Sequence, residues 1–305
     1  MTTKRTFIQE LNRQKVSYLF IIAPFALFLI FVVGPVIASF ILSFAKYNVV
    51  QPPNFVGLAN YKNILLNDPR FMKALKNSAF YVLGVVPIGI SFALFLAFAI
   101  DQRTKMKNFF KGVLFLPTVT SIVASSIMWS WLYAGGKYGL INYFILMKLG
   151  FQPIDWLLNP TWTLPAIMIM SVWAGLGYNV ILFTAGLQTI PHTIYEAAEV
   201  DGVGFWNKFF QITIPLLKPT IVFVSIMSAI VSIQVFEQIY VMTQSGGGTL
   251  GGVLDCALTG VPYLYDKGFT KLQMGYASAL AHVIFFMILF LTLINIKFVK
   301  SKVEY

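Results

Sequence analysis

The chain has 305 residues, of which 58% are hydrophobic and 11% are charged. Soluble globular proteins have roughly 45–50% apolar and about 25% charged residues, so this composition excludes an ordinary soluble domain and indicates a protein that lies in a lipid bilayer. The formal net charge is +11 at pH 7, but the basic residues stand between and beside long apolar runs. This distribution argues against a nucleic acid partner.

Six apolar runs are each long enough to cross a bilayer, which requires about 20 apolar residues in a helix. In chain order, the predicted spans are residues 16–44, 79–100, 109–133, 163–187, 213–242 and 277–298. The runs are continuous, whereas the strands of a membrane barrel alternate apolar and polar residues. We therefore expect an all-α polytopic membrane protein with about six transmembrane helices. The first run is too long for the apolar core of a signal peptide and is expected to be a retained span.

The basic residues predict the orientation, because they are more frequent in cytoplasmic loops than in outer loops. An even number of spans places both termini on one side, and cytoplasmic termini put 13 of the 22 basic residues inside. These residues are Lys4, Arg5, Arg13, Lys15, Arg103, Lys105, Lys107, Lys111, Lys208, Lys218, Lys297, Lys300 and Lys302. We expect both termini to be cytoplasmic.

Three outer loops are then predicted at residues 47–76, 134–162 and 243–273, and the second is long enough to contain a short helix near 141–149. Aromatic side chains near the ends of spans typically anchor a protein at the membrane surface. That role is expected of Trp129, Trp131, Tyr133, Trp156 and Trp162. No soluble domain is predicted, so residues 1–305 are interpreted as a single transmembrane domain.

One cytoplasmic loop, residues 188–215, is substantial. Pro191 can begin a helix there, because its missing N–H is not needed in the first turn, and Gly202 and Gly204 can end that helix. The helix has small side chains at Ala197 and Ala198, so a partner protein could approach it closely. Three acidic residues surround these alanines, namely Glu196, Glu199 and Asp201. The loop is therefore predicted to be a docking element.

This loop resembles the signature of the inner-membrane permease subunits of ATP-binding-cassette (ABC) importers. Their pattern is Glu-Ala-Ala, three residues, Gly, nine residues, and then Ile-x-Leu-Pro. The chain has Glu196, Ala197, Ala198, Gly202, Ile212 and Pro215 at the matching positions, and Ile214 replaces the Leu. The similarity extends over nearly the whole chain, through segments such as WAGLGYNVILFTAGLQTIP and MGYASALAHVIFFMILF.

The resemblance implies a type I importer permease in which residues 188–215 are a coupling loop held by a separate ATPase. The coupling residues are then Glu196, Ala197, Ala198, Asp201, Gly202, Ile212 and Pro215. The implied partners are a second, similar permease in a heterodimer, two copies of an ABC ATPase, and an extracytoplasmic solute-binding protein, at the cytoplasmic membrane of a bacterium or archaeon. The chain has no G-x-x-x-x-G-K-[ST] phosphate loop. ATP and Mg are therefore expected in the partner ATPase, and this chain is expected to be no enzyme and to hold no cofactor.

The same segments are similar to permeases for maltose, glycerol phosphate and oligosaccharides, which implies a sugar or oligosaccharide as substrate. By position in that family, the candidates for the substrate pathway are Gly175, Tyr178, Ser228 and Ser232. Polar groups inside a bilayer are costly and tend to face a cavity or a partner, which adds Asn179, Gln234, Glu237 and Gln238 as candidates. Two alternatives stay open. Ser228 and Ser232 could bond their own helix, and Glu237 could lie in solvent at the outer interface.

Three other functions compete with a sugar permease. An ABC permease for an amino acid, a peptide or a phosphate ester would favour Lys or Arg within the spans, and the central parts of the fourth and fifth spans have none. An ATP-independent carrier or channel would favour further ionisable residues inside the spans. An enzyme would need a catalytic or metal-binding constellation, and His192, His282 and the single Cys256 do not provide one.

Overall fold

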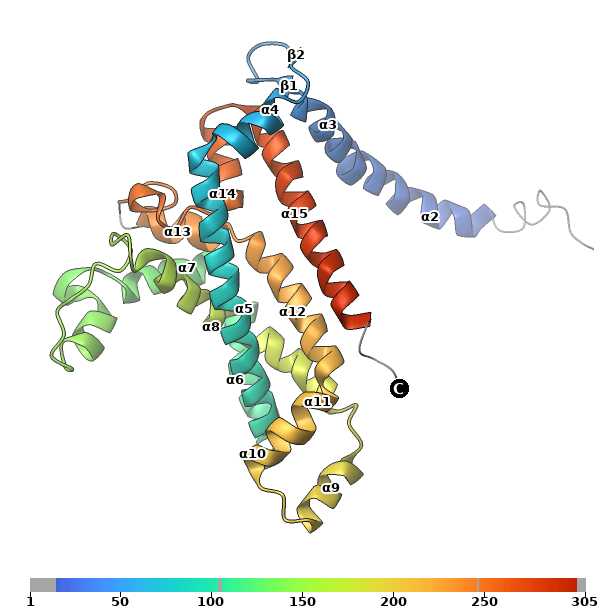
Figure 1. Cartoon of the computed structure of the whole chain (residues 1–305), viewed down its shortest axis with the longest axis vertical. Coiled ribbons are helices and arrows are strands. Elements are labelled where there is room, and N and C mark those ends of the chain that lie inside the picture. The colour runs from blue at the N-terminus through green and yellow to red at the C-terminus, as the bar shows by residue number, and fades with distance from the viewer. Residues whose placement is uncertain (1–14, 104–105, 246, 301–305) are drawn as a thin grey trace, which may run out of the picture. The chain divides into compact units, whose positions relative to one another are not determined.

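The computed structural model describes residues 15–103, 106–245 and 247–300, and Figure 1 shows that this part of the chain is almost entirely helical. Its strands are β1 (Ala45–Lys46) and β2 (Asn54–Phe55), which pair antiparallel with Ala45 opposite Phe55. The all-α prediction is confirmed. Five of the basic residues used to predict the orientation lie outside the described residues, namely Lys4, Arg5, Arg13, Lys105 and Lys302.

The elements follow one another along the chain as α-helices with short π and 3-10 turns between them. The α-helices are α2 (Lys15–Phe28), α3 (Gly34–Ser43), α4 (Ala59–Lys62), α5 (Pro69–Arg103), α6 (Lys107–Val119), α7 (Ile122–Leu132), α8 (Thr163–Leu187), α9 (His192–Val200), α10 (Phe205–Asn207), α11 (Ile214–Leu216), α12 (Lys218–Ile233), α13 (Glu237–Ser245), α14 (Gly260–Tyr265) and α15 (Met274–Lys300). The π turns are η1 (Leu29–Val33), η2 (Asn63–Asn67), η4 (Asn142–Leu146), η5 (Lys208–Thr213) and η7 (Asp266–Thr270), and the 3-10 turns are η3 (Gly136–Tyr138) and η6 (Val253–Asp255).

Within the described residues, four helices are long and apolar enough to cross a membrane, and the number rises to six if each of two sharply bent helix pairs is one span. The predicted number of about six matches the upper value. The predicted run 163–187 coincides with α8, whereas α5 begins at Pro69 rather than at residue 79. The first turns of α5 therefore include three basic residues that were predicted to lie in an outer loop, namely Arg70, Lys73 and Lys76.

Two of the predicted spans are sharply bent pairs of helices rather than single continuous helices. The run 109–133 consists of α6 and α7, which meet at 94° because Thr120 and Ser121 have extended backbone conformations. The run 213–242 begins with a bend of 73° between Phe205–Leu216 and α12. It is interrupted again at residues 234–236, before α13. Polar and proline residues inside an apolar run can end a helix without lowering the hydropathy that defines the run.

Prolines also account for two of the π turns. The turn η1 ends two residues before Pro35, and η5 ends two residues before Pro215. A proline ring collides with the carbonyl group four residues earlier and supplies no N–H, so the helix before it widens locally. The chain thus places a wide turn inside its first span and another directly before the bend that precedes α12.

The described residues group into two compact units. One comprises the residues up to Ile64 together with Lys267–Val283, and the other comprises the described part of Leu65–Asp266 together with the residues from Ile284. In the first unit, the Asn60 side-chain amide donates to the carbonyl oxygens of Ser43, at 2.9 Å, and Ala45, at 3.0 Å, which fixes the end of α3. The interpretation of residues 1–305 as one domain stays a prediction.

Helix α8 is the centre of the second unit, where it packs on α5, α6 and α12. Its Val180 and Phe183 side chains are completely buried in the hydrophobic cluster that these helices share. At Gly177 the backbone of α6 lies so close that an added Cβ atom would stand 2.2 Å from the Leu114 oxygen. One turn away, Thr118 Oγ1 donates to the Ala174 carbonyl oxygen at 3.1 Å. Glycine at position 177 thus permits the contact between α6 and α8.

The end of this unit near α7, α13 and α14 is held by polar contacts. Arg70, at the start of α5, pairs with both carboxylate oxygens of Asp255 at 2.8 Å and also with Asp266. Asn142, inside the predicted 141–149 segment, is completely buried and accepts a hydrogen bond from Trp156 Nε1 at 2.8 Å. The Arg70 contacts connect segments that are distant in the sequence, and the Asn142 contact closes the loop between α7 and α8.

Two of the aromatic residues predicted to be surface anchors are instead in the core. Tyr133 and Trp156 are 2% and 8% exposed, and their rings pack on each other in a buried cluster with Met170. Trp131, on α7, is 72% exposed and remains available for a lipid contact. The anchor interpretation fails for the buried residues because the loop between α7 and α8 folds back onto the helices.

The contact at Gly177 gives a first prediction. Gly177→Ala should destabilise the protein by about 1–3 kcal/mol, because the α6 backbone leaves no room for a methyl group. Thermal unfolding of the purified protein in detergent measures this change. The control is Gly112→Ala on α6, where nothing lies within 4 Å of the added Cβ atom. An unchanged unfolding temperature for Gly177→Ala would show that α6 and α8 do not approach as described.

Candidate substrate pathway and coupling loop

A cavity of about 540 Å³ opens between α5, α8, α12 and the start of α13. Its wall is mostly apolar, with a few hydroxyl and amide groups, which is the usual composition of a site for a small polar ligand. The lining residues are Tyr81, Val85, Val86, Gly89, Ile122, Ser171, Val172, Ala174, Gly175, Tyr178, Asn179, Met227, Ser228, Val231, Ser232, Gln234, Val235, Glu237 and Gln238.

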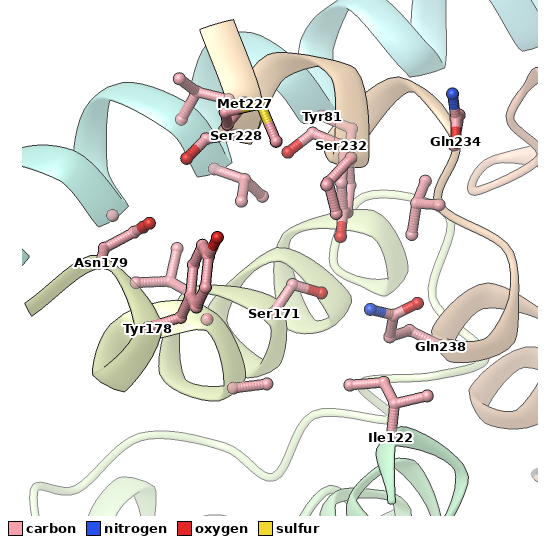
Figure 2. A pocket seen from close by; sticks show the side chains of 18 of the residues that line it. Tyr81, Ile122, Ser171, Tyr178, Asn179, Met227, Ser228, Ser232, Gln234 and Gln238 are labelled. Atoms are coloured by element: carbon pink, nitrogen blue, oxygen red, sulfur yellow. The ribbon is translucent and has the colours of Figure 1, made fainter. Parts of the chain in front are cut away.

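The polar groups of the cavity come from opposite walls. Figure 2 shows Ser171 and Tyr178 on α8, with Ser228 and Ser232 on α12 across the cavity and Tyr81 on α5 beside them. Ser228 and Ser232 are four residues apart and therefore share one face of α12. A ligand between these walls would meet hydroxyl groups on both sides and the Tyr178 ring, which is 47% exposed.

The interruption after α12 shapes one end of the cavity. The helix ends at Ile233, and the Val235 carbonyl oxygen accepts a hydrogen bond from Thr259 Oγ1 at 3.5 Å while the Val235 side chain is buried. The chain then resumes as α13, which packs on α7 and α8. Because α13 does not continue α12, its first residues, Glu237 and Gln238, border the cavity.

All seven residues predicted for the substrate pathway line this one cavity, and so does Gln238. These seven are Gly175, Tyr178, Asn179, Ser228, Ser232, Gln234 and Glu237. Within the described part of the chain, no hydrogen bond joins the Ser228 or Ser232 hydroxyl to its own helix, in contrast to Ser225, which donates to the Ile221 oxygen at 2.7 Å. An added Cβ at Gly175 meets nothing within 4 Å, so that position opens onto free space.

Two polar residues of the cavity were missed in the sequence. Tyr81 lies on α5, is buried and lines the cavity, as does Ser171 on α8. The Ser171 hydroxyl donates to the Ile167 oxygen at 2.8 Å. A single tyrosine or serine inside an apolar span is also typical of ordinary helix packing, so only the arrangement of α5 against α8 distinguishes these two residues.

The described lining of the cavity has few ionisable groups. None of the described residues that line the cavity is Lys or Arg, and Glu237 is its only carboxylate. Within the described residues, no group of three His, Cys, Asp or Glu side chains could hold a metal ion. The cavity is therefore suited to bind and release a neutral ligand rather than to hold a phosphate group.

The predicted coupling loop begins as a short helix, α9, which lies beyond one end of α5 and α12 in Figure 1. Pro191 precedes its first residue, as expected, and Gly202 ends it with a φ of +71°. The Val203 N–H bonds the Ala198 oxygen at 2.8 Å and the Gly202 N–H bonds the Glu199 oxygen at 3.1 Å, which satisfies the last carbonyl groups of the helix. The predicted helix, turn and second helical piece are all present.

Two side-chain contacts fix α9 to the segment that follows it. Lys208 Nζ donates to Glu199 Oε1 at 2.8 Å, and this hydrogen bond lowers the pKa of the exposed Glu199 carboxyl. Tyr195 OH and Thr213 Oγ1 lie 3.0 Å apart, and burial raises the pKa of the Tyr195 hydroxyl. The α9 helix is therefore held to η5 at two positions, Tyr195 and Glu199.

The alanines of the predicted docking surface face in different directions. Ala197 is exposed with Glu196 and Asp201, whereas Ala198 is 5% exposed and packs toward the rest of the chain. The expectation that both alanines form one open surface is therefore wrong for Ala198, because residues on consecutive helical positions point about 100° apart. Of the other predicted coupling residues, Ile212 packs against the core and Pro215 is exposed.

Comparison with known proteins decides the family. Residues 79–301 match the model of the binding-protein-dependent transport system inner membrane component. The chain belongs to this family. The permease is also 37% identical over 289 residues to the arabinooligosaccharides transport system permease protein AraP of Bacillus subtilis, a match that covers 94% of this chain and 89% of AraP.

Further relatives match the permease over nearly their whole length. The lactose transport system permease protein LacF of Rhizobium radiobacter is 34% identical, with 92% of each chain covered. The trehalose/maltose transport system permease protein MalF of Thermococcus litoralis is 32% identical, with 93% of each covered. Among solved structures, a chain of a bacterial ABC transporter involved in the import of the acidic polysaccharide alginate has the same fold, with a TM-score of 0.83 and 22% identity, covering 97% of this chain and 99% of that one.

The backbone of the coupling loop gives a second prediction. Gly202→Val should weaken the end of α9 by about 1–2 kcal/mol, because a side chain is strained at a φ of +71°. Amide hydrogen exchange across residues 192–203 should become faster. Gly204→Val is the matched control, because Gly204 has a φ of −68° and open space around it. Equal exchange in the two variants would contradict the left-handed turn at Gly202.

The pair between Lys208 and Glu199 predicts a dependence on pH. The folded-state pKa of Glu199 is lowered, so the pair stabilises the protein above the unfolded-state pKa and this contribution disappears as the pH falls through the folded-state value. Glu199→Gln should therefore lower the unfolding temperature slightly near neutral pH and have a smaller effect at an acidic pH. Glu196→Gln, on the exposed side of α9, should have no effect at either pH. A Glu199→Gln effect that is the same at both pH values would count against the pair.

Proposed function

We propose that the permease forms half of the pathway by which an ABC importer takes up a neutral sugar or oligosaccharide. The observation that carries this proposal is the cavity, which is lined by hydroxyl and amide groups and by the Tyr178 ring. None of the described lining residues is basic. Sugars are bound by such groups, whereas a phosphate or carboxylate substrate favours Arg or Lys. The relatives named for arabinooligosaccharide, lactose, and trehalose or maltose transport support the same substrate class.

Gly175, Tyr178, Asn179, Ser228, Ser232, Gln234 and Glu237 are proposed to line the path of the sugar. Tyr178 would place its ring against an apolar face of the sugar, and the two α12 serines would bond hydroxyl groups on the other side. The unpaired hydroxyls of Ser228 and Ser232 support this role, because they are free to donate to a ligand. A second permease of the same family is proposed to complete the pathway.

The energy for transport is proposed to come from two copies of a partner ATPase that holds ATP and Mg. Residues 188–215 would couple that ATPase to the pathway, through the exposed surface formed by Glu196, Ala197 and Asp201. Gly202, Ile212 and Pro215 would hold the shape of the loop, and Ala198 would pack it against the chain. This arrangement requires α9 and both termini to lie on the cytoplasmic side. An extracytoplasmic binding protein would deliver the sugar from the other side, and a periplasmic protein of this kind accompanies the alginate transporter in a second solved structure.

Co-purification is the experiment that tests the proposal. The tagged permease is purified from its native membrane in mild detergent, and its partners are identified by mass spectrometry. The expected partners are a P-loop ATPase and a second permease of the same family. The complex, reconstituted with its binding protein, should hydrolyse ATP faster in the presence of arabinotriose, lactose or maltotriose. Isolation of the permease alone as a stable homo-oligomer would contradict the importer and favour a carrier or channel.

The coupling loop can be tested in the same complex. Gly202→Val should leave the complex assembled but reduce sugar uptake for each ATP hydrolysed, because the surface offered to the ATPase changes shape. Gly204→Val should behave as the wild type. Uptake and hydrolysis that stay in the wild-type ratio in Gly202→Val would contradict the role of this loop in coupling.

A further inference from the structure

The segment between α13 and α14 contains a turn with a strained backbone. Leu254 and Asp255 each have a φ of +56°, and the nearby Gly251 and Gly252 have φ values of +88° and +77°. A positive φ is unfavourable for most side chains, and glycine, asparagine and aspartate tolerate it best. Leu254 is therefore the residue at which this turn is strained.

Polar side chains from the first turns of α5 hold this turn in place. Arg70 donates from Nε and Nη2 to the two Asp255 carboxylate oxygens, each at 2.8 Å. Lys73 Nζ donates to the Leu254 carbonyl oxygen at 2.6 Å, and Asn77 Nδ2 donates to the Asp255 carbonyl oxygen at 2.9 Å. The Leu254 side chain takes no part in these bonds. A strained conformation persists where the surrounding structure over-determines it, and such places cluster at functional sites.

The Leu254 side chain lies on the surface. It is 75% exposed, and the neighbouring Val253 is 36% exposed. Lipid does not account for this exposure, because Arg70 and Lys73 bond the same turn and charges are costly in hydrocarbon. Asparagine or glycine at this position would relieve the strain and leave every bond of the turn in place. The leucine is thus unfavourable for the chain alone, and a contact with another molecule would account for it.

This turn and the coupling loop lie at opposite ends of α5. Arg70 in the first turn of α5 holds the strained turn, whereas Phe98, near the other end, packs on Phe205 of α10 with ring centroids 5.0 Å apart. Between these two positions the helix rises about 42 Å, which exceeds the roughly 30 Å of a hydrocarbon layer. Figure 1 shows α9 and α10 together at that far end of α5. In the proposed importer α9 faces the ATPase, so the turn at Leu254 faces the extracytoplasmic side.

We infer that residues 253–255 are a docking point for the extracytoplasmic binding protein, and that the Leu254 side chain inserts into an apolar recess of that protein. This inference rests on the proposed function and deepens it by naming a contact surface for the partner that delivers the sugar. The rigid turn supports this role, because a contact that is fixed before binding loses little conformational entropy on binding. Among the described residues no carboxylate pairs with Lys73, so an acidic group beside the recess would complement its charge.

The test titrates the reconstituted complex with its sugar-loaded binding protein and measures the stimulated ATP hydrolysis. Leu254→Asn should raise the KM for the binding protein about tenfold, which is the effect of losing one well-packed interface side chain. Hydrolysis at saturation and hydrolysis without the binding protein should stay unchanged. Leu254→Met keeps an apolar tip and should stay within about twofold of the wild type. Leu66→Asn is the matched control, because Leu66 is 71% exposed and lies four residues before Arg70, and it should behave as the wild type.

Stability without the binding protein separates docking from a structural role. Because asparagine tolerates a positive φ better than leucine, Leu254→Asn should not lower the unfolding temperature of the complex, whereas loss of a leucine needed for packing would lower it. Leu254→Gly should likewise not lower the unfolding temperature and should show the same increase in KM. That variant also keeps the test possible if the asparagine variant fails to assemble.

Photochemical cross-linking identifies the molecule that Leu254 contacts. Leu254→p-benzoylphenylalanine, placed in the complex and illuminated with the sugar-loaded binding protein present, should cross-link to that protein. A cross-link formed only with the second permease or with lipid would overturn the docking point.

The outcomes distinguish this inference from the proposed function. A wild-type complex whose ATP hydrolysis no sugar-loaded binding protein stimulates contradicts the proposed function itself. A responsive complex whose KM for the binding protein is unchanged in Leu254→Asn, or rises equally in Leu66→Asn, overturns the docking point and leaves the proposed function in place. A lowered unfolding temperature in both the asparagine and the glycine variants also overturns it, because Leu254 would then be a structural residue.

Discussion

The described structure of the second unit depends on how closely other helices can approach α8. At Gly177 the α6 backbone occupies the space of a side chain, and at Gly186 the Thr220 side chain of α12 lies 2.7 Å from where a Cβ atom would stand. Small residues allow this in a membrane, where helices associate through close packing because lipid is as apolar as the helices themselves. The walls of the cavity are set by these contacts, since α8 contributes one wall and α12 the other.

The cavity also exists because the spans are not ideal helices. A bundle of straight apolar helices would fill its interior with side chains, whereas the interruption at residues 234–236 turns α13 away from α12 and brings polar residues to the gap. Non-helical backbone at membrane depth is tolerated where protein or a cavity surrounds it. The hydrogen bond from Thr259 to the Val235 carbonyl oxygen is one way in which this chain meets that requirement.

The sequence was most informative where polar residues occur within long apolar runs. Asn179, Gln234 and Glu237 could be predicted because few residue types other than apolar ones occur in these spans, whereas Gly175, Tyr178, Ser228 and Ser232 were implied by the family resemblance. The helix and turn of residues 188–215 could be predicted from Pro191 and Gly202, and the expected coupling role came from the resemblance. The bend at Thr120 could not be predicted, because a threonine and a serine between two apolar stretches do not lower the hydropathy of the run. Tyr81 and Ser171 were missed because they line one cavity only when α5 and α8 pack. The burial of Ala198 was missed because it depends on the segment that follows.

The angle between α6 and α7 has a consequence for the synthesis of the protein. With 13 and 11 residues, the two helices are about 20 Å and 17 Å long, so neither alone spans a hydrocarbon layer of about 30 Å. A complete crossing by this part of the chain therefore requires residues 107–132 to act together as one hydrophobic segment. The groove that receives α6 belongs to α8, which the ribosome makes about forty residues later. The close contact between the α6 backbone and Gly177 can therefore form only after α8 has been synthesised.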